Sequence, residues 1–137
     1  MTQNEKVLVQ NSLAQIAPTA DAAAGLFYCR LFEMDPSLMP LFRGGDMKER
    51  GRKLMQVVAF TVGSLDRLEE ILPAVHAMGA RHARYGVTAK HYETAASALL
   101  WSLEMGLGNA FTPEVKRAWV SVYRFLVTHM KAGAIAA

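Results

Sequence analysis

Apolar residues recur every three or four positions along most of the 137-residue chain, as they do in helices that bury one face. Sustained alternation of apolar and polar residues, typical of half-buried strands, is absent, and so are Asn-Gly and Asp-Gly hairpin turns. The pattern therefore predicts an all-α protein.

The apolar period divides the chain into helical stretches separated by Pro, Gly and polar residues. They comprise residues 5–16, a helix capped by Thr19 or Asp21 that ends near residue 34, and residues 47–65, 68–83, 89–107 and 113–131. Between the second and third stretches, residues 36–39 start a helical turn, Pro40 bends the chain, and residues 43–46 form a loop. The small residues from Ala132 onward form a tail that we expect to fray.

The composition is that of one ordinary globular unit. At 137 residues and 52% hydrophobic content, the chain can bury a core without disulfides, and we expect a single domain over residues 1–137. The net charge of +3 comes from charges scattered along the chain, which is too weak a bias to indicate nucleic-acid binding. Residues 1–10 are polar, and the longer apolar runs are interrupted, so no membrane association is expected. We expect a soluble cytoplasmic protein.

The cysteine, the serines and three of the four histidines show no pattern typical of a catalytic or metal site. Cys29 is the only cysteine, which excludes an internal disulfide, and we expect it to be a small buried apolar residue. Nucleophilic catalysis has little support, because there is no Gly-x-Ser-x-Gly elbow and no Walker-type loop. His76, His91 and His129 lack the mutual spacing and the acidic or thiol companions of a zinc site.

His82 is the histidine best placed to bind a metal. It lies four residues after Met78 and seven after Val75, so its ring shares a helix face with apolar side chains. A neutral imidazole in such a dry place could ligate a metal, and the face suits a bulky apolar cofactor. From the residues alone, the simpler interpretation is a core histidine that hydrogen-bonds a backbone carbonyl.

A series of short motifs changes that interpretation. In chain order they are Phe27-Tyr28-x-x-Leu31-Phe32, Pro36, Leu41-Phe42, Arg52-Lys53-Leu54-Met55, Gly79-x-Arg81-His82-x-x-Tyr85-Gly86-Val87, Leu107-Gly108-x-Ala110-Phe111-Thr112-Pro113 and Ala118-Trp119-x-x-Val122-Tyr123. Together, over about residues 5–130, they resemble the globin family, in particular bacterial single-domain globins related to the haem domain of flavohaemoglobins and to neuroglobin. The resemblance implies an all-α globin fold of about seven to eight helices around one haem b (iron protoporphyrin IX).

The resemblance assigns roles on the proximal side of that haem. His82 matches the histidine that ligates the iron, and Phe42 matches the phenylalanine that stacks on the porphyrin. The second ring nitrogen of His82 is then expected to donate to a backbone carbonyl one turn earlier, near Met78, whose side chain should pack beneath the ring. Val87 and Tyr92 match positions that contact the proximal face.

The distal side departs from the usual pattern. Tyr28 matches a tyrosine that donates a hydrogen bond to bound dioxygen in many bacterial globins, although a core tyrosine would look the same. Leu54 matches an apolar residue over the haem, and the position usually filled by histidine or glutamine falls on Arg50. A charged guanidinium is not an iron ligand, so Arg50 either pairs a haem propionate, turns inward to support Tyr28, or lies solvated outside.

Other matched positions concern packing and charge. Gly51 and Ala24 match small residues where two globin helices cross closely. Lys53 and Arg81 flank the expected haem edge and either pair its propionates or are simply solvated.

The resemblance implies reversible binding of dioxygen, and of CO and NO, at a five-coordinate haem. The alternative is nitric oxide dioxygenation, for which electrons would come from a separate reductase because the chain ends at Ala137 without a flavin or nicotinamide module. In flavohaemoglobins a glutamate late in the last helix supports the proximal histidine through the tyrosine matched by Tyr92. Here its place falls at about Ala134, which implies a less anionic proximal ligand. A haem-based redox or gas sensor is the third alternative.

Overall fold

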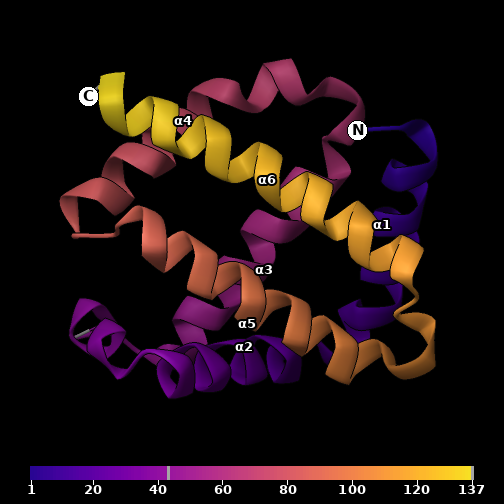
Figure 1. Ribbon diagram of the computed structural model, residues 1–137, viewed down its shortest axis with the longest axis horizontal. Coiled ribbons are helices and arrows are strands. Elements are labelled where there is room, and N and C mark those ends of the chain that lie inside the picture. The colour runs from indigo at the N-terminus through magenta and orange to yellow at the C-terminus, as the bar shows by residue number, and fades with distance from the viewer. Residues whose placement is uncertain (43, 137) are drawn as a thin grey trace.

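Helices account for nearly all of the computed structural model, which describes residues 1–42 and 44–136 (Figure 1). Within these ranges there are six α-helices and no strand. The α-helices are α1 (Gln3–Ile16), α2 (Ala20–Met34), α3 (Met47–Gly63), α4 (Leu68–Arg84), α5 (Ala89–Leu107) and α6 (Pro113–Ala136). Short 3₁₀-helices lie between them: η1 (Ala17–Thr19), η2 (Pro36–Phe42), η3 (Leu65–Arg67) and η4 (Gly108–Ala110). The all-α prediction is confirmed.

The number of α-helices is smaller than the seven to eight expected, because short connecting segments wind as 3₁₀-helices. Pro40 lies inside η2 instead of ending it, since the φ angle of proline is compatible with 3₁₀ geometry. The third predicted helix ends at Gly63, and Leu65 belongs to η3. Arg43, the first residue of the predicted loop, lies outside the described residues.

Side chains cap the N-terminus of α1 but not that of α2. The backbone N–H of Glu5 donates to Thr2 Oγ1 (3.1 Å), and the Thr2 N–H donates to Glu5 Oε1 (2.9 Å), which satisfies two otherwise free helix donors. At α2 the Thr19 hydroxyl instead donates to the Ile16 carbonyl (3.2 Å). No side chain forms a capping bond at Thr19, and Asp21 lies within the first turn, so the predicted side-chain cap was wrong.

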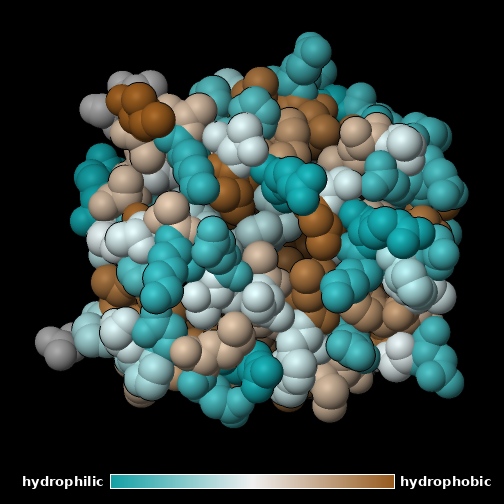
Figure 2. Space-filling view, viewed as in Figure 1, coloured by the Kyte–Doolittle hydropathy of each residue, from teal (hydrophilic) through white to brown (hydrophobic). Residues whose placement is uncertain are grey.

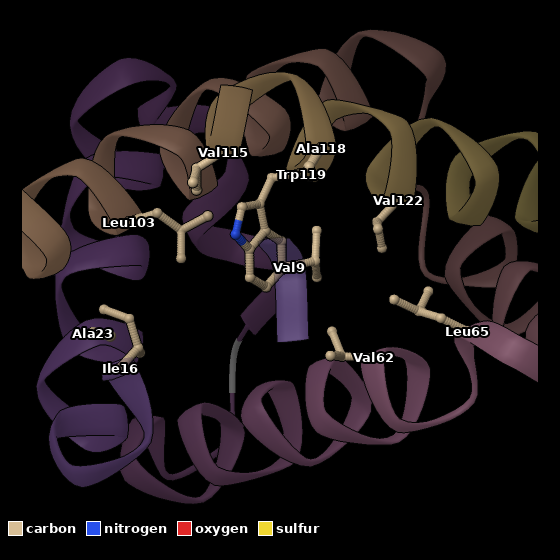
Figure 3. Close-up of a cluster of buried hydrophobic side chains, with 10 residues drawn as sticks. All are labelled: Val9, Ile16, Ala23, Val62, Leu65, Leu103, Val115, Ala118, Trp119 and Val122. Atoms are coloured by element: carbon tan, nitrogen blue, oxygen red, sulfur yellow. The ribbon is translucent and has the colours of Figure 1, made fainter. Parts of the chain in front are cut away.

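The main hydrophobic core joins α1, α2, α3, η3, α5 and α6 around Trp119 (Figure 3). Its buried members are Val9, Ile16, Ala23, Val62, Leu65, Leu103, Val115, Ala118, Trp119 and Val122. The Trp119 indole N–H donates to Ser12 Oγ (2.8 Å), and the Ser12 hydroxyl donates to the Val9 carbonyl (3.0 Å). The buried indole donor is therefore satisfied, as burial requires.

α4 and α6 cross so closely that their backbones touch. A Cβ added at Gly79 would overlap the backbone of Met130, and one added at Gly133 would overlap the backbone of His76. Gly133 is buried, and α6 continues through Ala136. The expectation that the helix ends near residue 131 and frays was therefore wrong, because contact with α4 orders this last turn. This crossing sets the position of α4, which carries His82.

α2 has a narrow buried face. Its buried side chains include Ala24, Phe27 and Leu31, which recur at helical spacing. Cys29 lies two residues from Phe27, on the opposite side of the helix, and is exposed. The prediction that Cys29 is buried was therefore wrong. The close crossing predicted at Ala24 is confirmed, because a Cβ added at Gly51 of α3 would lie 3.1 Å from Ala24 Cβ.

α5 and α6 leave a groove between them, visible near the middle of the face shown in Figure 2. Its volume is about 440 Å³. It is lined by Ala89, Tyr92, Glu93, Ala96, Leu99, Leu100, Val120, Tyr123, Arg124, Val127, Thr128 and Lys131. In the described part of the chain, no helix is long and apolar enough to cross a membrane.

Candidate functional site

His82 lies in the last turn of α4, and its ring is held by a single hydrogen bond. Nδ1 lies 2.8 Å from the backbone carbonyl oxygen of Met78. A carbonyl only accepts, so Nδ1 carries the proton, and a neutral ring then presents an unprotonated Nε2. The bond expected near Met78 is present. The ring is partly exposed and offers one lone pair in a fixed direction.

The turn after α4 restrains the backbone at His82. The Val87 N–H donates to the His82 carbonyl (3.0 Å), and Gly86 has a φ of 94°, which favours glycine. A Cβ added at Gly86 would lie 3.7 Å from Leu41 Cδ2. The turn therefore brings the end of α4 close to η2. A contact of Val87 with the proximal face of a haem stays a prediction.

Tyr92 of α5 covers the His82 ring from one side. The two ring centroids are 6.4 Å apart with an angle of 21° between the planes. The Tyr123 hydroxyl donates to the Tyr92 carbonyl (2.6 Å), which ties this part of α5 to α6. Burial raises the pKa of both Tyr92 and Tyr123, so both phenols remain neutral and able to donate. Met78 and Tyr92 also pack against the small cluster between α4 and α6.

An aromatic cluster forms the second half of the candidate site. The ring of Phe42 in η2 lies edge-on to Tyr28 (5.5 Å between centroids) and to Phe32 (5.2 Å) of α2. Leu54 of α3 packs against the same cluster. The structure thus brings together Tyr28, Phe42 and Leu54, three of the residues predicted for the distal side and the porphyrin face.

Arg50 of α3 lies against this cluster, and its side chain is not freely solvated. Its guanidinium carbon is 5.2 Å from the centroid of the Phe42 ring, a cation–π contact. Arg50 Nε is buried without a hydrogen-bond partner, and Arg50 forms no ion pair with any residue described. Burial raises the pKa of the Tyr28 hydroxyl, while the positive charge of Arg50 acts in the opposite direction.

The two cations predicted at the haem edge stay at the surface. Lys53 and Arg81 are exposed, and within residues 1–42 and 44–136 neither makes an ion pair. Neighbouring Arg52 instead pairs with Glu49. A propionate-binding role for Lys53 and Arg81 stays a prediction.

Sequence reasoning missed two glycines and one pair of histidines. Gly133 continues the buried stripe of α6 three residues after Met130, so the helical period could have found it. Gly45 lies under the Arg50 guanidinium, where an added Cβ would overlap it; nothing in the pattern indicates this contact. His76 and His129 have ring centroids 6.0 Å apart across the α4–α6 crossing, and only the fold brings them together.

The site suits a metal ion that a cofactor already supplies with most of its ligands. In the described residues, no group of three or more His, Cys, Asp or Glu side chains could hold a bare metal ion. A single imidazole is sufficient when a macrocycle supplies four other ligands, as in haem. The free lone pair of His82, the aromatic wall around Phe42 and the donors of Tyr28 and Arg50 therefore fit a haem.

Several known proteins are similar to this chain in sequence. A family model for globins matches residues 25–130. A flavohemoprotein of Bacillus subtilis is 26% identical over 126 residues, covering 90% of this chain but only 32% of that protein, so the chain spans about a third of its length. Neuroglobin of Chaenocephalus aceratus is 25% identical over 146 residues, which cover 97% of this chain and 92% of that protein.

Solved structures show the same fold. An engineered carbene transferase, made from a proposed nitric oxide dioxygenase of Rhodothermus marinus, superposes with a TM-score of 0.88 at 25% identity, over 99% of this chain and 94% of that one. A hexacoordinated haem protein from an anhydrobiotic tardigrade gives a TM-score of 0.84 at 17% identity, over 98% and 95% of the two chains.

Proposed function

Because the chain belongs to the globin family, which indicates haem-based binding of gases, we propose that it binds dioxygen reversibly at one haem b held by His82. CO and NO are ligands of the same site. In this proposal residues 1–137 form one globin domain that acts as a cytoplasmic oxygen carrier, with no nucleic-acid or membrane partner.

The geometry of His82 carries the proposal. The 2.8 Å bond from Nδ1 to the Met78 carbonyl fixes the tautomer, so Nε2 is free to ligate iron and a strong acceptor supports the ring. The His82 ring is only partly buried, whereas a histidine that serves only in the core would be buried. A haem bound by His82 would supply an iron with an open coordination position for a diatomic gas.

Neighbouring side chains would hold the haem and its ligand. Phe42 and Leu54 would provide apolar contacts to the porphyrin, and Met78, Val87 and Tyr92 would contact its proximal face. Lys53 and Arg81 would pair the propionates from the surface. Tyr28 would donate to the bound gas through its phenol, which burial keeps protonated.

Oxygen equilibrium measurements on the reduced, haem-loaded protein test this function. We expect the deoxygenated spectrum to change on adding dioxygen and to return fully when the gas is removed, over repeated cycles. Rapid oxidation to the ferric form at every exposure to dioxygen would contradict a carrier role.

Nitric oxide dioxygenation with a separate reductase is the alternative that the comparisons favour, through the flavohemoprotein and the Rhodothermus protein. The position near Ala134 carries no acid that could support the His82 ring through Tyr92, so we expect slower turnover. Nitrate formation from NO and dioxygen, measured with a supplied reductase, would establish this activity if it persists over many cycles.

A redox or gas sensor is the remaining alternative, and the similarity to neuroglobin favours it. It would be supported by a six-coordinate ferrous spectrum without added ligand. We expect a five-coordinate spectrum, because Arg50 occupies the position from which a distal histidine would bind iron.

A further inference from the structure

The guanidinium of Arg50 is only partly exposed to water. Its Nε is buried and unbonded, and no acidic side chain among the described residues pairs with it. Removing a charged group from water is unfavourable unless an opposite charge or hydrogen bonds replace the water. A buried donor of this kind often hydrogen-bonds a bound water or ion.

Gly45 lies directly against this guanidinium. A Cβ at residue 45 would overlap the Nη2, Nε and Cζ atoms of Arg50, so only glycine leaves the space that the side chain occupies. On its other side the guanidinium lies over Phe42, at 5.2 Å. The loop and η2 therefore confine Arg50 between them.

The Tyr28 hydroxyl is a second hydrogen-bond donor near the positive charge of Arg50. The Tyr28 ring lies 5.5 Å from that of Phe42, and the charge of Arg50 lowers the pKa that burial raises at the Tyr28 hydroxyl. A phenol and a guanidinium both donate hydrogen bonds, and only the guanidinium adds a full positive charge. A ligand between them would be recognised best if it were small and negatively charged.

We propose that Arg50, positioned by Gly45 and acting beside Tyr28, raises the affinity of the ferric haem site for small inorganic anions such as fluoride and azide without changing its affinity for neutral CO. This inference rests on the haem site proposed above. The charge of Arg50 offsets that of the incoming anion, and the anion provides the partner that Arg50 lacks. Neutral CO gains nothing from the charge.

The test is the affinity of the ferric, haem-loaded protein for fluoride and azide, followed by its absorption spectrum. We expect Arg50→Leu to raise both dissociation constants at least about tenfold, as the loss of one charge-assisted hydrogen bond implies. Gly45→Ala should raise them several-fold while leaving the arginine in the chain, because the added methyl displaces only the end of a flexible side chain.

Arg52→Leu is the matched control. Arg52 lies two residues away on α3, is exposed and pairs with Glu49 at the surface. The same loss of one positive charge there should change anion affinity by less than about twofold. CO affinity of the ferrous protein should change by less than about threefold in all three variants.

Several outcomes would overturn the proposal. Unchanged fluoride and azide affinities in Arg50→Leu would do so, and so would an equal loss in Arg52→Leu, which would indicate a general field effect. Faster haem loss in Arg50→Leu with unchanged anion affinity would assign Arg50 to a propionate instead.

The haem-free protein gives an independent measurement. Arg50→Leu removes the cation–π contact with Phe42 but no ion pair, so the Tm of the apoprotein should fall by less than about 4 °C. A larger fall would show that Arg50 has a stronger stabilising partner within the chain and would contradict the proposal. Failure of the haem site itself is distinct, because the unmodified protein would then show no haem spectrum to titrate.

Discussion

The two sides of the candidate haem site are held in different ways. On the proximal side, backbone contacts decide the geometry: α4 meets α6 at Gly79 and Gly133, and the His82 ring is anchored to a carbonyl of its own helix. On the distal side, side-chain packing sets the geometry. Tyr28 and Arg50 lie against Phe42, and among the described residues neither the Tyr28 hydroxyl nor the Arg50 guanidinium hydrogen-bonds the backbone.

This difference indicates where the site tolerates change. A backbone crossing has no rotamers to adjust, so an extra methyl there must move a whole helix. A distal side chain can swing away at low cost and alter the ligand preference while the fold stays intact. We therefore expect proximal substitutions to affect haem content and stability, and distal ones to affect ligand kinetics.

The largest effect is expected from His82→Ala. Loss of the imidazole removes the protein ligand to iron, so stable haem incorporation should be abolished. The haem content of the purified protein measures this, with His91→Ala as a control on a histidine outside the candidate site. Unchanged haem content and spectrum in His82→Ala would show that His82 is not the ligand to the haem iron.

Gly79→Ala tests the backbone crossing. The new methyl would overlap the Met130 backbone, and we expect a loss of about 1–3 kcal/mol in the free energy of unfolding, with weaker haem retention. Gly25→Ala is the control, because a Cβ there meets nothing within 4 Å. That change should stabilise α2 by about 0.5–1 kcal/mol. Equal effects of the two substitutions in denaturant unfolding would show that the crossing is not tight.

Tyr28→Phe tests the distal side. Loss of a buried hydrogen bond of about 1.5–3 kcal/mol should speed dioxygen dissociation by around tenfold or more. Stopped-flow displacement of dioxygen by CO gives this rate directly. Since the phenyl ring fills the same space, haem content should not change. If the dissociation rate is the same as in the unmodified protein, Tyr28 serves only in packing.

Tyr123→Phe should give the smallest effect. It removes the 2.6 Å bond to the Tyr92 carbonyl, and a loss of about 0.5–1.5 kcal/mol in unfolding free energy is expected. Haem content should remain normal, because the α4–α6 crossing still positions His82. A marked loss of haem would mean that Tyr92, held by Tyr123, is the main support of the proximal side.

The sequence predicted the proximal side better than the distal side, for the same physical reason. The bond from His82 to Met78 and the Ala24–Gly51 crossing were expected from the resemblance to globins, in which these contacts lie between regular helices. The position of the Arg50 guanidinium against Phe42 depends on Gly45 in a loop, and loop geometry has no period that a sequence pattern can reveal.

Errors in the helices have similar causes. The end of α6 was placed too early because Ala and Gly suggest fraying, whereas contact between Gly133 and His76 orders the last turn. Cys29 was expected inside on residue type alone, although its helical position relative to Phe27 places it outside. In both cases tertiary position overrides a composition-based preference.

The absorption spectrum of the purified, haem-reconstituted protein, ferric and ferrous, with and without CO, tests the central claim most directly. We predict one haem per chain, a ferrous spectrum typical of five-coordinate histidine-ligated haem, and a complete shift on adding CO. A chain that retains no haem, or whose bound haem does not respond to CO, would contradict the assignment of His82 and of the gas-binding site.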